Sequence, residues 1–135
     1  MAGQATKVTE LQVTTKNELG AMAKLSLPLK QNKINIECFC GYEMENQATF
    51  MLTTSDNAKA RTLLTNAGYT VTENPVTLWT TNNTPGEINN ATSALAEARV
   101  NTNYAYSTSV QGGKTTSVVF ATNDTTKTVD VLNRL

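Results

Sequence analysis

The sequence predicts an α+β fold of two ferredoxin-like sandwiches, each with the element order βαββαβ, the second lacking its last strand. Strand-like alternation and helix-like spacing of apolar residues follow one another in the same order in both halves. A polar frame also recurs, in which an Asn precedes a Gly by three residues and another Asn follows the Gly by fifteen. Its two copies are Asn17, Gly20 and Asn35, and Asn83, Gly86 and Asn101. A repeat of about half of the 135 residues predicts two domains, 1–74 and 75–135.

The first half begins with a strand at about residues 8–15, where apolar side chains alternate with polar neighbours. A helix follows over about 19–31, with Asn17 near its N-cap and apolar residues at helical spacing. Pro28 lies inside this helix, where proline costs about 3 kcal/mol unless the helix kinks or ends early. The remaining elements are strands at 33–44 and 48–54, a helix with Asp56 as its N-cap and Gly68 just beyond its C-terminus, and a short strand at 69–73.

Strict alternation along two of the strands assigns their side chains to opposite faces. In the strand 33–44, one face carries Ile34, Ile36, Cys38, Cys40 and Tyr42, and the other carries Asn35, Glu37 and Phe39. In the second half, Tyr104 and Tyr106 share a face with Val100 and Thr102. The cysteines are predicted to be small buried hydrophobes, because a metal site would need further ligands. The tyrosines are predicted to belong to a core or an interface, with a pocket wall as the alternative.

The second half repeats the order from a strand at about 76–81. The residues Thr84 to Glu87 predict a capping box with Pro85 at the first helical position. Two strands follow at 100–110 and 115–123, joined by a turn on Gly112 and Gly113, and a last helix runs from Asp124 to Leu135. The second hairpin is two residues longer than the first.

The strand 76–81 would be an exposed edge, because no strand follows the last helix. Natural proteins rarely leave an apolar edge strand bare. We therefore expect this strand to pair with the first half of the chain or with a second chain.

Charge and composition exclude several classes of function. Eleven basic residues balance eleven acidic residues without a run of like charge, which argues against nucleic-acid and anionic membrane partners. The chain has no His and no visibly paired carboxylates, so neither catalysis, a metal site nor a cofactor is predicted. No signal peptide or membrane span is evident, which predicts a cytoplasmic protein.

The loops before the two repeated helices identify a family. They read Asn17-Glu18-Leu19-Gly20 and Asn83-Thr84-Pro85-Gly86, and each is followed by an Asn at the start of the next strand. In these residues the chain resembles a pair of ACT domains, the sensors that regulate amino-acid metabolism. The resemblance implies a non-enzymatic protein that binds a free amino acid at a domain or subunit interface. It also implies a homodimer and a separate regulated protein; the alternative is a ligand-free protein–protein interaction module of the same fold.

A glycine loop that opens a helix suits the carboxylate of an amino acid, because it offers bare N–H groups and the positive end of the helix dipole. An Asn carboxamide both donates and accepts hydrogen bonds, which suits a zwitterion. We therefore expect the two asparagines of each frame to bracket one small pocket, completed in similar ACT domains by a second domain. The expected ligand-binding residues are Asn17, Leu19, Gly20, Ala21, Asn35, Ile36, Asn83, Pro85, Gly86, Glu87, Asn101 and Thr102.

Simpler interpretations of these residues stay open. Asn17 can be an N-cap only, whereas Thr84 is the better cap in the second copy and leaves Asn83 free. Asn35 and Asn101 can be turn residues that start a strand. The loops differ between the copies, so one or both can bind, and Met22, Phe39 and Tyr104 are candidates for contacts to the ligand side chain.

Overall fold

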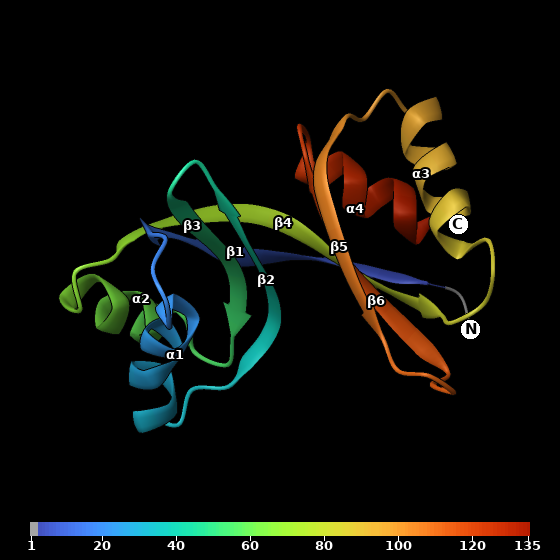
Figure 1. The fold of residues 1–135 in the computed structure, drawn as a ribbon. Coiled ribbons are helices and arrows are strands. Elements are labelled where there is room, and N and C mark those ends of the chain that lie inside the picture. The colour runs from blue at the N-terminus through green and yellow to red at the C-terminus, as the bar shows by residue number, and fades with distance from the viewer. Residues whose placement is uncertain (1–2) are drawn as a thin grey trace. The chain divides into compact units, whose positions relative to one another are not determined.

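The computed structural model describes residues 3–135 and contains the predicted elements, except that the strands expected at 69–73 and 76–81 form one continuous strand (Figure 1). They are β1 (Gln4–Lys16), α1 (Ala21–Gln31), β2 (Ile36–Met44), β3 (Gln47–Thr54), α2 (Asn57–Asn66), β4 (Thr70–Asn82), α3 (Glu87–Glu97), β5 (Thr102–Ser109), β6 (Thr115–Thr122) and α4 (Thr125–Asn133). The strand order is β2-β3-β1-β4-β6-β5. The predicted α+β class with ferredoxin-like repeats is confirmed.

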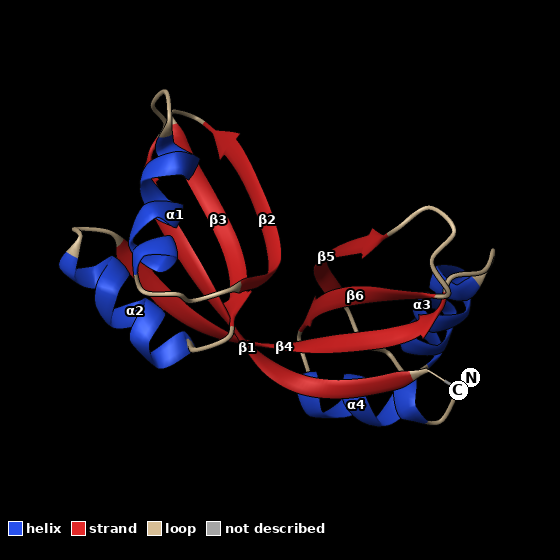
Figure 2. Cartoon of the chain, turned by 90° about the horizontal axis from the view of Figure 1, so that it is seen from below, coloured by secondary structure: helices blue, strands red, loops and turns tan. Residues whose placement is uncertain are grey.

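The chain forms two compact units, which we call the first and second domains. The first domain is Thr9–Asn74, and the second is Pro75–Leu135 together with residues 3–8. Helices α1 and α2 lie side by side in the first domain, and α3 and α4 do so in the second (Figure 2). The units thus differ from the expected division in one respect, because residues 3–8 belong with the second half of the chain.

Residues 3–8 supply the strand that the second domain seemed to lack. They form the start of β1, which is the neighbour of β4 in the sheet. Ala5 is buried in the core of this domain beside Trp79 and Leu132. The Asn133 side chain accepts a hydrogen bond from the Ala5 N–H at 2.8 Å and donates one to the Ala5 carbonyl at 3.0 Å. Of the two coverings expected for the strand 76–81, pairing with the first part of the chain is therefore the one observed.

The two cores contain equivalent pairs of facing residues on neighbouring strands. The large residue of the pair is on the second strand in the first domain and on the first strand in the second domain. In the first domain Val13 on β1 lies opposite Phe50 on β3. In the second domain Trp79 on β4 lies opposite Val118 on β6. Each pair thus sets one large residue against one small residue, which conserves volume between the helices and the sheet.

The strict alternation expected along β2 and β5 is wrong at one point in each strand. The pairing register shifts between Ile36 and Cys38 in β2, and between Thr102 and Tyr104 in β5. A bulge of this kind inserts one residue and reverses the faces beyond it. Phe39 therefore packs against the same core as Ile36 and stacks on Phe50 with ring centroids 5.8 Å apart.

The helix starts also differ from the prediction. Helix α1 begins after Gly20 and α3 after Gly86, both glycines have left-handed backbone (φ 79° and 95°), and no side chain caps either helix. Neither the Asn17 cap nor the Thr84 capping box forms. Asp56, by contrast, caps α2 as predicted, accepting a hydrogen bond from the Lys59 N–H at 3.1 Å.

Candidate functional site

The loop before α1 is held at the end of the sheet by its backbone. The Asn17 N–H donates to the Asn46 carbonyl at 2.9 Å, which ties the loop to the β2–β3 turn. Gly20 then reverses the chain in a left-handed conformation, in which a Cβ would meet nothing within 4 Å. The glycine is thus required by the backbone angle and not by a close neighbour. The result is a helix N-terminus that opens directly onto the sheet.

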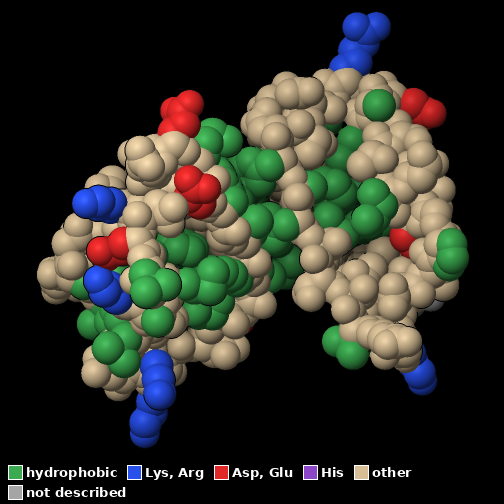
Figure 3. Space-filling model, in the orientation of Figure 1, with side chains coloured by type: hydrophobic (Ala, Val, Ile, Leu, Met, Phe, Trp, Pro, Cys, Tyr) green, Lys and Arg blue, Asp and Glu red, His purple; other side chains and the backbone are tan. Residues whose placement is uncertain are grey.

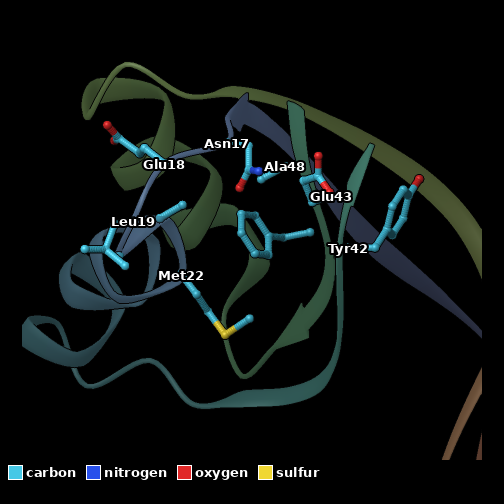
Figure 4. Close-up of a pocket in the computed structure, with 10 residues that line it drawn as sticks. Asn17, Glu18, Leu19, Met22, Tyr42, Glu43 and Ala48 are labelled. Carbon is cyan, nitrogen blue, oxygen red and sulfur yellow. The ribbon is translucent and has the colours of Figure 1, made fainter. Parts of the chain in front are cut away.

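A cavity of about 580 Å³ lies beside this helix N-terminus. Its lining residues are Asn17, Glu18, Leu19, Gly20, Ala21, Met22, Tyr42, Glu43, Ala48 and Phe50. Ala48 and Phe50 are buried residues of β3, whereas Leu19 is fully exposed. Figure 4 shows Asn17 and Glu43 on the same side of the cavity, with Met22 facing them from α1. The volume is in the range of pockets that hold small molecules.

One ion pair neutralises charge at the rim of this cavity. The Lys24 Nζ lies 2.9 Å from the Glu18 carboxylate, and both side chains are exposed. The hydrogen bond and the positive charge of Lys24 lower the pKa of Glu18, and the same contact raises the pKa of Lys24. The Asn17 carboxamide, in contrast, makes no hydrogen bond to any residue that the structure describes. It is therefore available to a ligand.

Asn35 and Ile36 lie at the opposite end of the first domain. The Asn35 carbonyl accepts from the Ser55 N–H, and its own N–H donates to the Ser55 hydroxyl, both at 2.9 Å. Since Asn46 and Ser55 flank the two ends of β3, the Asn17 and Asn35 contacts are separated by the eight residues of that strand, roughly 26 Å. Helix α1 carries the chain from one end to the other. The expectation that both asparagines of a repeat bracket one pocket is therefore wrong within this domain.

The second domain repeats this arrangement with a smaller cavity of about 330 Å³. Its lining residues are Asn83, Thr84, Gly86, Glu87, Ile88, Asn89, Ser107, Ser109 and Thr116. Asn101 again lies at the far end, where its carbonyl accepts from the Asn123 N–H at 3.1 Å and its N–H donates to the Asn123 Oδ1 at 3.0 Å. Thr102 follows it there, and Pro85 is not among the residues that line the cavity.

Two side chains of the second cavity already have partners within the domain. The Asn83 Nδ2 donates to the Gly113 carbonyl at 3.1 Å. The Glu87 carboxylate accepts a hydrogen bond from the hydroxyl of Thr81, a buried residue, at 2.7 Å. Glu87 is the first residue of α3, so its negative charge stands at the helix N-terminus.

A comparison with protein families decides what this repeated fold is. The family model described as an ACT domain pair matches residues 6–135. The chain belongs to this family. The ACT resemblance inferred from the loop residues is thus confirmed, and the two cavities lie at equivalent places in the two ACT domains.

Solved structures share the fold of this ACT pair at low sequence identity. A protein from Bacteroides thetaiotaomicron superposes with a TM-score of 0.88 at 22% identity, covering 96% of this chain and 89% of that chain. The regulatory subunit of aspartate kinase from Thermus thermophilus, in a ligand-free form, gives a TM-score of 0.69 at 14% identity, with coverages of 96% and 95%. Aspartokinase III from E. coli, in complex with lysine and aspartate, gives 0.62 at 10% identity, covering 99% of this chain and 32% of that chain. No curated protein sequence matches the chain.

Residues 3–135 contain neither a membrane-spanning helix nor a metal-binding cluster. No helix in that range is long and apolar enough to cross a membrane. The same residues contain no group of three or more His, Cys, Asp or Glu side chains arranged to hold a metal ion.

The sequence reasoning missed the part of the ACT cavity that comes from the hairpin. Tyr42, Glu43, Ala48 and Phe50 line it, although none is near the glycine loop in sequence. The missing signal was the strand register, because Thr15 at the end of β1 pairs with Ala48 near the start of β3. Met22, one of the candidates for a contact to the ligand side chain, is among the residues that line the cavity.

Proposed function

We propose that this ACT pair is a non-enzymatic regulatory protein that binds a free amino acid in the cavity of the first domain. The observation that carries the proposal is a cavity of about 580 Å³ beside a helix N-terminus that no side chain caps. The carboxylate of the ligand takes the free N–H groups of α1, where the helix dipole favours a negative charge. The ammonium takes the Asn17 carbonyl oxygen and the Glu43 carboxylate.

The relatives support the proposal. Several structures with this fold are regulatory subunits or regulatory domains of aspartate kinase, and the E. coli enzyme is described in complex with two amino acids, lysine and aspartate. The present chain extends over about a third of that enzyme's length. The chain also covers 95% of the regulatory subunit from Thermus thermophilus. By analogy with that subunit, we propose that it acts on a separate regulated protein.

The open side of the cavity suits a homodimer, which we propose to be cytoplasmic. Leu19 and Met22 at the cavity are exposed, and Figure 3 shows apolar side chains on the surface of the domain that carries α1 and β2. We propose that a second copy of the chain covers this side, so that the ligand lies at a subunit interface. Ligand binding then favours one packing of the two copies, and this shift is the signal.

The same exposed side chains favour a second candidate, a protein–protein interaction module of the same fold without a ligand. Exposed apolar side chains beside an open cavity are typical of a docking surface. In that case the partner protein fills the cavity itself.

Thermal unfolding of the full chain against each of the twenty amino acids at millimolar concentration separates the two candidates. A ligand present at 100 times its dissociation constant adds about 2.7 kcal/mol to the free energy of unfolding. The proposal expects a selective rise in Tm with one amino acid or a few related ones. A flat response to all twenty contradicts it and favours the interaction module.

A further inference from the structure

We infer that only the first domain binds an amino acid and that its ligand has an apolar side chain. This inference rests on the proposed function and narrows it to one site and one ligand class. It is carried by a comparison of the two cavities, position by position, because the ACT repeat places equivalent residues at equivalent points.

The loop asparagines Asn17 and Asn83 differ in the hydrogen bonds of their side chains. In the second domain the Asn83 carboxamide donates to the Gly113 carbonyl at 3.1 Å. Gly113 belongs to the turn that makes the β5–β6 hairpin two residues longer than β2–β3. In the first domain the shorter turn provides no such acceptor, and the Asn17 side chain makes no hydrogen bond within residues 3–135.

The first helical residue decides whether a carboxylate can bind. In the first domain this residue is Ala21, and the first turn of α1 contains no acidic side chain. In the second domain it is Glu87, which is half-buried and fixed by the Thr81 hydroxyl at 2.7 Å. Its charge already occupies the helix N-terminus of α3, so a second carboxylate is repelled there.

The walls of the cavities differ in the same sense. Ala48 pairs with Glu43 in the first domain, whereas the equivalent pair in the second is Thr116 and Ser109. The second cavity therefore has no acidic side chain at the position of Glu43, the residue assigned to the ammonium group of the ligand. It also has a hydroxyl where the first has a methyl group.

The floor of the first cavity is apolar because β2 has a glycine at the right place. Gly41 pairs with Phe50, and a Cβ on Gly41 would lie 2.8 Å from the Phe50 ring. The ring thus lies against bare backbone, next to Ala48 and Met22 in the cavity lining. At the equivalent place in the second domain Ser107 pairs with Val118. A charged ligand side chain on the apolar floor would lose its hydration without a partner, since Glu18 is already paired with Lys24.

Isothermal titration of the full chain tests the inference with seven probes: leucine, isoleucine, methionine and phenylalanine against lysine, aspartate and threonine. We expect binding of at least one apolar amino acid, with one site per chain and at least tenfold preference over the polar three. Two sites per chain, or preference for a polar or charged probe, overturns the inference but leaves the proposed function standing. If none of the seven probes binds, the inference fails, and a negative twenty-amino-acid unfolding panel then rejects the proposed function as well.

Three variants locate the site. Ala21→Glu places in the first domain the residue found in the second, and it should weaken binding at least tenfold. Ala48→Thr introduces the residue found at 116 and should weaken the same binding, so a folding defect in one variant does not leave the question open. Glu87→Gln keeps an acceptor for Thr81 and should leave the affinity unchanged. Binding that survives in both Ala21→Glu and Ala48→Thr, or that is lost in Glu87→Gln, assigns the ligand to another site and overturns the inference.

Discussion

At the scale of single residues, Asn17 and Asn83 occupy the same position in the repeat but have different surroundings. The sequence predicts both as ligand-binding residues, since their frames are identical. The difference arises from a two-residue insertion some thirty positions away, which brings the Gly113 carbonyl to Asn83. The hydrogen-bond partner of Asn83 thus depends on the length of a distant turn, and the local sequence motif does not reveal it.

Alanine substitutions at these two positions should separate binding from stability. Asn17→Ala should weaken ligand binding by roughly ten- to a hundredfold with little change in Tm, because a hydrogen bond to a charged group contributes about 1.5–3 kcal/mol. Asn83→Ala should leave the affinity unchanged and lower the free energy of unfolding by about 1 kcal/mol through loss of the bond to Gly113. Calorimetric titration and urea unfolding of both variants measure the two effects. Equal affinities in the wild type and Asn17→Ala would contradict the assigned role.

Gly20 and Gly86 are needed for their left-handed backbone conformation. Gly20→Ala should lower the free energy of unfolding by about 1–2 kcal/mol, since a Cβ in this conformation is strained even with nothing within 4 Å. Gly20→Asn should cost less, because Asn tolerates the left-handed region. Urea denaturation of the two variants gives the comparison, and equal midpoints for Ala and Asn would show that the backbone angle is not the cause.

At the scale of helices and strands, apolar periodicity predicts where an element lies better than which way its side chains point. The position of the strand that contains Cys38 and Phe39 is predicted correctly. A bulge after Ile36, however, reverses the faces of the sheet toward which the following side chains point. Nothing in the local composition marks the bulge, since it is fixed by pairing with β3. The helix starts were misplaced for a related reason: Thr84 is a good cap by type, but the left-handed Gly86 begins the helix instead.

The attachment of β1 to α4 is a second feature at this scale. Asn133→Ala should lower the free energy of unfolding by about 2 kcal/mol, because it removes both hydrogen bonds to Ala5 and leaves two backbone groups without partners. The neighbouring Arg134→Ala is the matched control. It breaks only an exposed ion pair with Asp130 on the same helix, which contributes about 0.3–0.5 kcal/mol. Urea unfolding monitored by circular dichroism compares the two, and a similar loss in both variants would contradict the role of Asn133.

At the scale of the whole molecule, the repeat and its approximate midpoint could be predicted from the sequence. The contribution of residues 3–8 to the second domain could not. Alternation predicts a strand only at about residues 8–15 and does not reveal that it begins at Gln4. The structure assigns residues 3–8 to the second domain and the rest of β1 to the first. The missing information is long-range, since Ala5 and Asn133 are 128 positions apart.

Removal of the chain up to residue 8 should destabilise the second domain selectively. It exposes the edge of β4 and uncovers Trp79, against which Gly3 packs so closely that a Cβ would lie 2.5 Å from the indole nitrogen. Trp79 is the single tryptophan, so its fluorescence reports on this domain alone. We expect a shift of emission to longer wavelength and a lower Tm by that signal. Unchanged emission would contradict the assignment of residues 3–8 to the second domain.

The contribution of residues 3–8 to the second domain also affects how the protein folds during synthesis. Translation produces residues 3–8 long before α4, so on the ribosome the second domain has one of its strands well before it has the helix that holds that strand. Residues 9–74 can begin to fold during synthesis, whereas the second domain must wait for Asn133 and then close a loop of nearly the full chain length. Contacts of such sequence separation slow folding. We therefore expect nascent chains to pass through a stage in which the first domain is folded and the edge of β4 is exposed to chaperones.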